Sequence, residues 1–267
     1  LERGPVRCTV EVRRRFLDST VIQHIQVYND SPRIDFKTHI DWKEKHILLK
    51  AAFPVEVHSD KAVYDIQFGN IERPTHWNTS WDTARFEVCG HKWADLSENG
   101  YGVSLMNDCK YGYDIKDGTM RLTLLKSAVS PNENADREEH DFIYSLLPHR
   151  GDFRTCTIPQ AYALNMPFEA VISSPHAGKL PQSFSFAAVD QENVVLETIK
   201  RSEQGSDVIL RMYEAYNRRG SVTLRLSLPV GEAWECDMLE EPVKKLRHKG
   251  NEVVMEMLPY EIKTVKL

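Results

Sequence analysis

The sequence predicts an all-β protein of 267 residues that is organised in two parts. Segments of strand length alternate between apolar and polar residues, which is the period of a half-buried β-strand. Turn-forming clusters separate these segments, as at residues 29–32, 98–100 and 116–118. Because almost no helix-length apolar pattern interrupts them, the strands are expected to form antiparallel sheets packed as sandwiches.

The first part is a larger β region. Its first predicted strand, at residues 6–12, places Val6, Cys8, Val10 and Val12 on one side. Alternation of the same kind predicts further strands at residues 34–42, 46–53, 62–69, 84–90, 101–107, 120–126 and 142–149.

Three segments break the strand pattern. Residues 131–141 are polar without an apolar period and are expected to form an exposed loop, whereas residues 157–167 are the best helix candidate. Residues 173–183 are rich in Ser, Pro and Gly and are expected to be a linker. The predicted division is therefore a larger β region at 1–172 and a small terminal β-sandwich at 184–267. Strands of the terminal sandwich are expected at residues 184–189, 194–200, 207–216, 221–228, 252–258 and 261–267.

Composition indicates an ordinary globular protein and excludes some function classes. The net charge of -5 argues against a nucleic-acid binder that works through a broad basic surface. The sequence contains no signal peptide and no apolar run long enough to span a membrane. The five cysteines are widely spaced and include no CxxC, which favours a reducing compartment, the cytoplasm, over a disulfide framework.

Residues 73–100 concentrate aromatic and polar side chains that suit a sugar site. Three of the five tryptophans lie here, at Trp77, Trp81 and Trp93, among histidines, acids and an amide. Aromatic rings offer a flat apolar face and a polar edge, which matches the apolar faces and polar rims of sugar rings. The same tryptophans also fit the core of a β-sandwich with polar loop residues beside them, so composition leaves both interpretations open.

The segment NDCKYGYDI at residues 107–115 carries the densest set of functional groups. Asp108 and Asp114 flank Lys110 and two tyrosines, and Gly112 fits the positive φ of a hairpin. A glycosidase places two carboxyl groups across the scissile bond. A lysine between these two acids favours their ionised forms, which disfavours a general acid. The spacing alone assigns no catalytic pair, and a polar hairpin is the alternative interpretation.

No metal site is predicted from the residues. Cys89 and His91 lie two residues apart on a predicted strand, with His76 upstream, but a lone CxH pattern without a second half is a weak zinc signal. A histidine with a structural role is the more common case. The sequence also contains no GxSxG, no HExxH and no glycine-rich phosphate loop after a strand.

Three stretches, at residues 72–127, 139–153 and 194–224, are long and specific enough to carry a family resemblance. The second reads EHDFIYSLLPHRGDF, and the third begins VVLETIKRSEQGSD. Together they closely resemble the C-terminal β region of glycoside hydrolase family 38 α-mannosidases, most of all the cytoplasmic and bacterial branch. The likeness covers residues 5–267. Since the chain begins at Leu1 without a methionine and soon enters a strand pattern, we expect a domain of a longer protein.

The resemblance implies a retaining, zinc-dependent exo-α-mannosidase that hydrolyses terminal α-mannosides or oligosaccharides. In that family an N-terminal catalytic domain carries the nucleophile, the acid/base group and the zinc ligands, and retention implies a covalent mannosyl-enzyme intermediate. The β region is a galactose-mutarotase-like antiparallel supersandwich followed by a small terminal β-sandwich. Because this sequence lacks the N-terminal motifs, we assign no catalytic residue and no zinc ligand to it, and we expect it to be inactive alone.

The resemblance also implies a supporting role beside the chain's own N-terminal catalytic domain. In the family, loops of the β region pack on that domain and help to close the substrate cleft. The matching loops here predict seven residues at the edge of the cleft: Asn107, Asp108, Lys110, Tyr111 and Tyr113, with His76 and Trp93. The face that packs on the neighbouring domain is expected to be apolar or aromatic, near the N-terminus or in residues 76–113, and could also support a homo-oligomer.

Two other functions are alternatives. The tryptophans would also suit a stand-alone carbohydrate-binding module. A mutarotase-like sugar epimerase on a similar fold needs an acid and a base that converge near pH 7, for which His76, His91 and Glu98 are candidates. The family resemblance points to neither of them.

Overall fold

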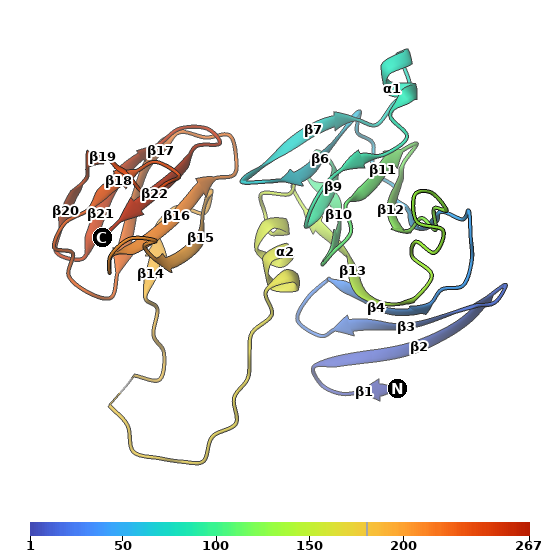
Figure 1. Cartoon of the computed structure of the whole chain (residues 1–267), viewed down its shortest axis with the longest axis horizontal. Helices are drawn as coiled ribbons and strands as arrows, with labels where there is room; N and C mark the ends of the chain where they lie inside the picture. The colour runs from blue at the N-terminus through green and yellow to red at the C-terminus, as the bar shows by residue number, and fades with distance from the viewer. Residues whose placement is uncertain (180) are drawn as a thin grey trace. The chain divides into compact units, whose positions relative to one another are not determined.

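The computed structural model describes residues 1–179 and 181–267. Residue 180, which belongs to the predicted linker, lies outside the described residues. The chain forms two compact units, unit 1 at Leu1–Glu169 and unit 2 at Ala170–Leu267, which Figure 1 colours from blue at the N-terminus to red at the C-terminus.

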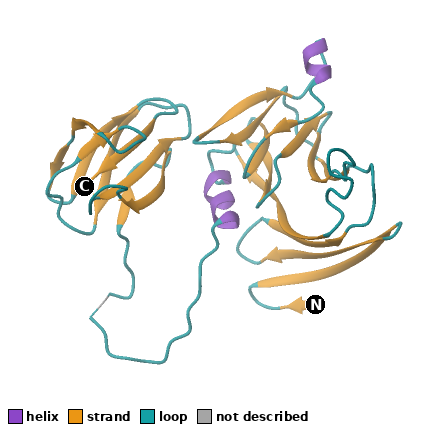
Figure 2. Cartoon of the chain, viewed as in Figure 1, coloured by secondary structure: helices purple, strands orange, loops and turns teal. Residues whose placement is uncertain are grey.

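Strands make up nearly all of the regular structure, as Figure 2 shows. The helices in the described part of the chain are α1 (Ser80–Ala84) and α2 (Thr157–Asn165), both in unit 1. The predicted all-β fold class is therefore confirmed, as is the helix expected within residues 157–167. The short helix α1 was not predicted.

Unit 1 contains two antiparallel sheets, which we call the large sheet and the facing sheet. Within the described residues the large sheet has the strand order β1 (Glu2–Arg3), β2 (Arg7–Phe16), β3 (Ser19–Tyr28), β4 (Ile34–Asp41), β13 (Glu139–Arg150), β10 (Tyr101–Asn107), β9 (Trp93–Glu98), β6 (Lys61–Ile66) and β7 (Gly69–Pro74). The facing sheet has the order β5 (Leu49–Pro54), β12 (Thr119–Leu125), β11 (Gly112–Lys116) and β8 (Val88–Cys89). Strand β13 inserts between β4 and β10 and so places Tyr144 beside both Phe36 and Asn107.

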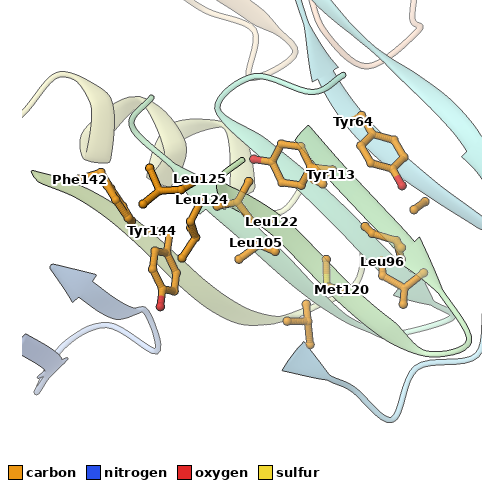
Figure 3. Packing of buried hydrophobic residues seen from close by; sticks show 14 of the residues in the cluster. Tyr64, Leu96, Leu105, Tyr113, Met120, Leu122, Leu124, Leu125, Phe142 and Tyr144 are labelled. Carbon is orange, nitrogen blue, oxygen red and sulfur yellow. The ribbon is translucent and has the colours of Figure 1, made fainter. Parts of the chain in front are cut away.

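The core of unit 1 lies between these two sheets (Figure 3). Pleating gives each strand two faces, and the register puts Leu96, Leu105 and Tyr144 of the large sheet on the face toward the core. They pack in one cluster with Tyr113 and Leu122 of the facing sheet, and all five side chains are buried. Burial of one such apolar side chain contributes about 2 kcal/mol, so this layer is the main source of stability in unit 1.

The opposite face of the large sheet is polar at its centre and carries α2. Asp95 of β9 is 1% exposed, and its carboxylate accepts hydrogen bonds from the hydroxyl groups of Ser97 and Ser104. Nε2 of His149 lies 2.6 Å from Oδ2 of the same carboxylate. The Ser104 hydroxyl also bonds to Thr157 at the start of α2, at 2.7 Å. A buried carboxylate must be paired, so this network both satisfies Asp95 and fixes α2 on the sheet.

Unit 2 is an antiparallel sandwich with a core of its own. Leu210, Leu224, Val253 and Val265 have no solvent exposure and meet in this core. Within the described residues, one sheet has the order β14 (Ala187–Val189), β17 (Gly220–Leu226), β21 (Glu252–Met257) and β20 (Arg247–Lys249). The other sheet has the order β15 (Val194–Arg201), β16 (Val208–Glu214), β22 (Ile262–Lys266), β18 (Trp234–Cys236) and β19 (Pro242–Lys245).

Three local expectations differ from the structure. The loop expected at 131–141 ends earlier, because β13 begins at Glu139, which pairs with Asp41 of β4. The strand expected at 84–90 shrinks to β8, because Ala84 belongs to α1. The alternation also missed several strands, among them β3, β7, β9, β18, β19 and β20. In β3, residues on both faces are partly buried, and the apolar pattern is correspondingly weak.

The core-side face of the large sheet continues onto β2 and β3, where the described residues leave it partly uncovered. Val10 pairs with Ile25, and Ile25 with Phe36, so these residues share one face with the core. Val10 is 59% exposed and Val27 49%. We call Val10, Phe16, Ile25 and Val27 the apolar ledge. A cleft of about 500 Å³ lies where the ledge meets β5. The apolar face expected near the N-terminus is thus present.

The pair of His149 and Asp95 makes unit 1 sensitive to pH. Burial lowers the pKa of His149, but the hydrogen bond and charge of Asp95 outweigh burial and raise the pKa above 6.5. The folded chain therefore binds this proton more tightly than the unfolded chain does. The resulting stabilisation is complete below pH 6.5 and is lost as the pH rises through the folded-state pKa.

We expect the free energy of unfolding of unit 1 to fall as the pH rises above 6.5 in the wild type, and to fall less in His149→Gln. That variant leaves the buried Asp95 without its cation and should lose about 3 kcal/mol at low pH. Urea unfolding followed by tryptophan fluorescence measures both effects. His39→Gln, at an exposed histidine beside Asp141, is the control and should keep the wild-type slope. Equal slopes in His149→Gln and the wild type would contradict the assignment.

Candidate functional site

The turn at residues 107–113 is held by the side chain of Asn107, the last residue of β10. Its Oδ1 accepts hydrogen bonds from the backbone N–H groups of Cys109, at 2.9 Å, and of Lys110. Two N–H donors can be met only by the carbonyl end of the amide, which fixes the orientation of the side chain. An Asn side chain that bonds to the backbone two residues on is a common way to close a turn.

The NH₂ end of the same side chain ties the turn to both sheets. Asn107 Nδ2 donates to the backbone oxygen of His91 at 3.0 Å and to the Tyr113 hydroxyl at 2.5 Å. That hydroxyl donates in turn to the same oxygen of His91, at 3.1 Å. Tyr113 lies on β11 of the facing sheet with no solvent exposure, and burial raises its pKa, so the hydroxyl keeps its proton.

Asp108 and Asp114, the two acids of this segment, serve different strands. Asp108 bonds twice to the backbone of Ile143 on β13: its N–H donates and its Oδ2 accepts, each at 3.1 Å. The two carboxylate oxygens of Asp114 accept from Lys50 and Arg121, each at 2.9 Å. Because each acid already has its own partners, the segment does not present the pair of free carboxyl groups that a glycosidase uses.

The thiol and the ammonium group of the turn are also engaged. Cys109 is exposed, but partial loss of hydration at the thiol, together with the hydrogen bond and charge of Asp108, raises its pKa to about 11. The thiol is therefore protonated near neutral pH and is a poor nucleophile. Lys110 Nζ lies 4.4 Å from the centre of the Phe142 ring, a cation–π contact.

A hollow of about 170 Å³ opens beside the turn. Its lining consists of His91, Lys92, Asn107, Asp108, Cys109, Lys110, Tyr111 and Asn165. Tyr111 is 58% exposed, and its ring meets the His91 ring edge-on with the centres 5.3 Å apart. The volume is below the roughly 300 Å³ of a typical ligand pocket, so the hollow suits one wall of a site that another surface completes.

Four of the seven predicted cleft-edge residues line this hollow. They are Asn107, Asp108, Lys110 and Tyr111. Tyr113 lies beneath the turn and is buried. Their place at the edge of a substrate cleft stays a prediction.

His76 and Trp93, the other two, lie away from the hollow. Nδ1 of His76 is 3.5 Å from Oδ2 of Asp82 beside α1. Trp93 is 1% exposed and stacks on Phe153 with ring centres 5.1 Å apart, on the polar face of the large sheet. Its burial gives it a packing role in the described chain.

Two lining residues, Lys92 and Asn165, were not indicated by the sequence. Lys92 directly precedes β9, and the pairing of β9 with β10 brings it beside the turn. That hairpin could be inferred from the turn signal at 98–100. Asn165 ends α2 and donates to the backbone oxygen of Asn107 at 3.0 Å across 58 positions of the chain. Nothing in the local sequence of Asn165 indicates this contact.

The residues considered as metal ligands do not assemble into a metal site. Cys89 is exposed on β8, whereas His91 lines the hollow. Within residues 1–179 and 181–267, no three His, Cys, Asp or Glu side chains come together as they would around a metal ion. Neither helix in the same residues has the length and apolar character of a membrane span.

Comparison with protein families matches both parts of the chain. Residues 1–134, just over half of the 267, match the glycosyl hydrolases family 38 C-terminal domain. Residues 193–265 match the glycosyl hydrolases family 38 C-terminal beta sandwich domain.

Several similar proteins are α-mannosidases by name. Alpha-mannosidase G of Dictyostelium discoideum is 40% identical over 100% of this chain, and human alpha-mannosidase 2C1 is 41% identical over 94%. Alpha-mannosidase of Saccharomyces cerevisiae is 32% identical over 98% of the chain. The chain spans only about a quarter of the length of these relatives, at 25%, 24% and 27%.

Among solved structures, the chain resembles an alpha-mannosidase from Enterococcus faecalis V583. The TM-score is 0.79, and the match covers 93% of this chain and 29% of that one. At 21% identity this likeness concerns the fold alone. The family match over more than half of the chain shows that it belongs to glycosyl hydrolase family 38, as part of the C-terminal β region of that family.

Proposed function

We propose that this chain is the C-terminal, non-catalytic part of a retaining, zinc-dependent exo-α-mannosidase that removes mannose from terminal α-mannosides. The observation that carries the proposal is the identity of 40% and 41% to two α-mannosidases along almost the whole chain. Because the chain spans a quarter of those proteins, we assign the reaction to the N-terminal catalytic domain of the longer polypeptide.

The pairing of the charged side chains among the described residues supports a non-catalytic role for this chain. A retaining glycosidase needs two carboxyl groups about 5 Å apart, whereas Asp108 is engaged by Ile143, and Asp114 by Lys50 and Arg121. The described residues also do not fit a zinc ion, since no three potential ligands converge among them. We therefore place the zinc, like the nucleophile, in the catalytic domain.

We assign the apolar ledge to the contact with that catalytic domain. Large exposed apolar patches mark interaction surfaces, and the ledge joins a cleft that a partner segment could fill. Arg14 and Arg15 line the same cleft, which favours acidic side chains in the partner segment. A second copy of the chain is the alternative occupant and would make the protein a homo-oligomer.

We propose that the hollow beside Tyr111 faces the mannoside cleft. Tyr111 offers an exposed ring for the apolar face of a sugar, and Asp108 and Lys110 lie beside it. Asn107 and Tyr113 act beneath it by holding the turn. His76 and Trp93 lie elsewhere and are not part of this proposal. We also place the protein in the cytoplasm, since all five cysteines are free thiols.

Nothing in the described residues favours the two alternative functions. The tryptophans that suggested a carbohydrate-binding module are separated, because Trp93 is buried and Trp81 is 77% exposed on α1. The histidines and the acid considered for an epimerase are likewise in separate places with other contacts. His91 lines the hollow, and Glu98 accepts a hydrogen bond from the His58 N–H at 2.7 Å.

The chain alone should not hydrolyse mannosides. Incubated with an aryl α-mannoside and zinc, it is expected to show no release of the aryl group above the buffer rate, because the reacting carboxyl groups are assigned to the missing domain. Turnover at an enzyme-like rate would overturn the non-catalytic role.

A chimera tests the ledge. In it, this chain replaces the matching quarter of Dictyostelium alpha-mannosidase G. We expect the chimera to hydrolyse the aryl α-mannoside, and Val10→Asp with Val27→Asp to reduce its activity about a hundredfold, because burying two unpaired carboxylates disrupts the contact. Val254→Asp, at a valine of unit 2 that is 46% exposed, is the matched control and should keep full activity. Equal activity of the ledge variant and the control would contradict the assignment.

In the same chimera, Tyr111→Ala tests the hollow. We expect KM for the aryl α-mannoside to rise about fivefold with kcat nearly unchanged, because a stacking contact binds substrate and transition state alike. Tyr101→Ala, at a tyrosine of β10 that is 42% exposed and does not line the hollow, serves as the control and should keep the wild-type KM. An unchanged KM in Tyr111→Ala would remove the hollow from the cleft.

A further inference from the structure

One edge of unit 1 carries an arginine with a side-chain nitrogen that has no hydrogen-bond partner among the described residues. Arg73 lies on β7, an edge strand of the large sheet, opposite the buried Ala62. The side chain therefore points to the core side, where the guanidinium carbon lies 4.8 Å from the centre of the Tyr64 ring. Its Nη1 is buried and has no hydrogen-bond partner among the described residues. A buried N–H without an acceptor loses its hydration without replacement.

Two further cations surround the small hollow in front of Arg73. Arg85, which ends α1, lines it and makes no ion pair within the described residues. Lys116 is buried, and its ammonium group donates to the backbone oxygens of Pro74, at 3.1 Å, and His76, at 2.9 Å. Backbone oxygens and the Trp77 ring, whose centre lies 4.7 Å from Nζ, thus contact the charge of Lys116 directly, whereas Asp82 acts on it from farther away. Burial, and in addition the charge of Arg85, lowers the pKa of Arg73.

The two acids at this hollow are engaged by other cations. Both carboxylate oxygens of Asp114 are taken by Lys50 and Arg121. Glu87 pairs with Lys50 at 2.7 Å and also accepts a hydrogen bond from Thr123. The local charge is therefore positive at the side where Arg73 and Arg85 lie. Like charges in a partly buried site destabilise one another unless an anion joins them.

The hollow is small and its rim is aromatic. Its volume is about 10 Å³, room for one water-sized group. A carboxylate oxygen fits this space, whereas a sugar ring does not. Phe86 lines the hollow and is 74% exposed, and Trp81, four residues before Arg85, is 77% exposed. The capping box between Thr79 and Asp82 fixes α1, so Trp81 projects from an ordered helix. Exposed aromatic residues beside arginine are typical anchors of protein interfaces.

We propose that Arg73, Arg85 and Phe86 form a docking site for an acidic polypeptide segment, which places one oxygen of an Asp or Glu carboxylate in the hollow and packs an adjacent apolar side chain on Phe86. The carboxylate pairs with the guanidinium groups that line the hollow and offsets the two positive charges of Arg73 and Arg85. This recognition needs no property of a mannoside and does not depend on the function proposed above.

The isolated chain tests the site directly. It is titrated with a blocked tripeptide that has glutamate between two phenylalanines, with the same peptide carrying glutamine, and with acetate. The backbone amide signals of residues 71–74 and 85–88 are followed by NMR. We expect the glutamate peptide to bind at least about tenfold more tightly than either the glutamine peptide or acetate, since only it combines charge and apolar contacts.

Variants locate the binding on the protein. Arg85→Met should weaken the glutamate peptide at least about fivefold, and because Arg85 is exposed its replacement leaves the fold intact. Arg73→Met should weaken it further. Arg3→Met, at an exposed arginine of β1, is the matched control and should bind like the wild type. Equal affinity for the two peptides, or full affinity in Arg85→Met, would overturn the site. Acetate binding as tightly as the glutamate peptide would overturn the polypeptide as its occupant.

Discussion

The turn at residues 107–113 and the hollow beside it depend on the bonds made by one amide, that of Asn107. Its oxygen closes the turn that follows β10, and its NH₂ group reaches His91 before β9 and Tyr113 on the facing sheet. Its backbone oxygen receives Asn165 from α2. One side chain therefore joins the large sheet, the facing sheet and the helix. Since every partner is a fixed donor or acceptor, the turn has little freedom, and the hollow beside Tyr111 has a defined shape.

Different interactions stabilise the two faces of the large sheet. One face packs apolar side chains against the facing sheet, where loss of contact with water drives association. The other face buries Asp95 with His149 and two serines under α2, where hydrogen bonds and charge replace water. This division explains the exposed ledge: strands β2 and β3 continue the apolar face, but the described residues of unit 1 only partly cover it.

The distribution of charge supports the non-catalytic role proposed for this part of a family 38 protein. Asp95, Asp108 and Asp114 all have partners within the chain, and none is left free to react. The groups that lack full partners in the described chain lie elsewhere: the exposed apolar ledge, the exposed Arg85, and the buried Nη1 of Arg73. These groups support the proposal that this chain contacts a neighbouring domain of a longer protein.

The sequence by itself determined the all-β class, most of the strands, the helix within 157–167 and the family. Period-two alternation and long motifs are local signals, and they need no knowledge of the fold. Only the tertiary structure decided which neighbour covers each face. Alternation states that Trp93 and Tyr113 point to one side of a strand, but not that Phe153 or Asn107 lies there. Such contacts depend on strand order, as when β13 inserts between β4 and β10, and on partners as distant as Asn165. The segment 107–115 consequently changed from a candidate for catalysis to a braced turn, since its reactive groups are bound by residues that its own sequence does not specify.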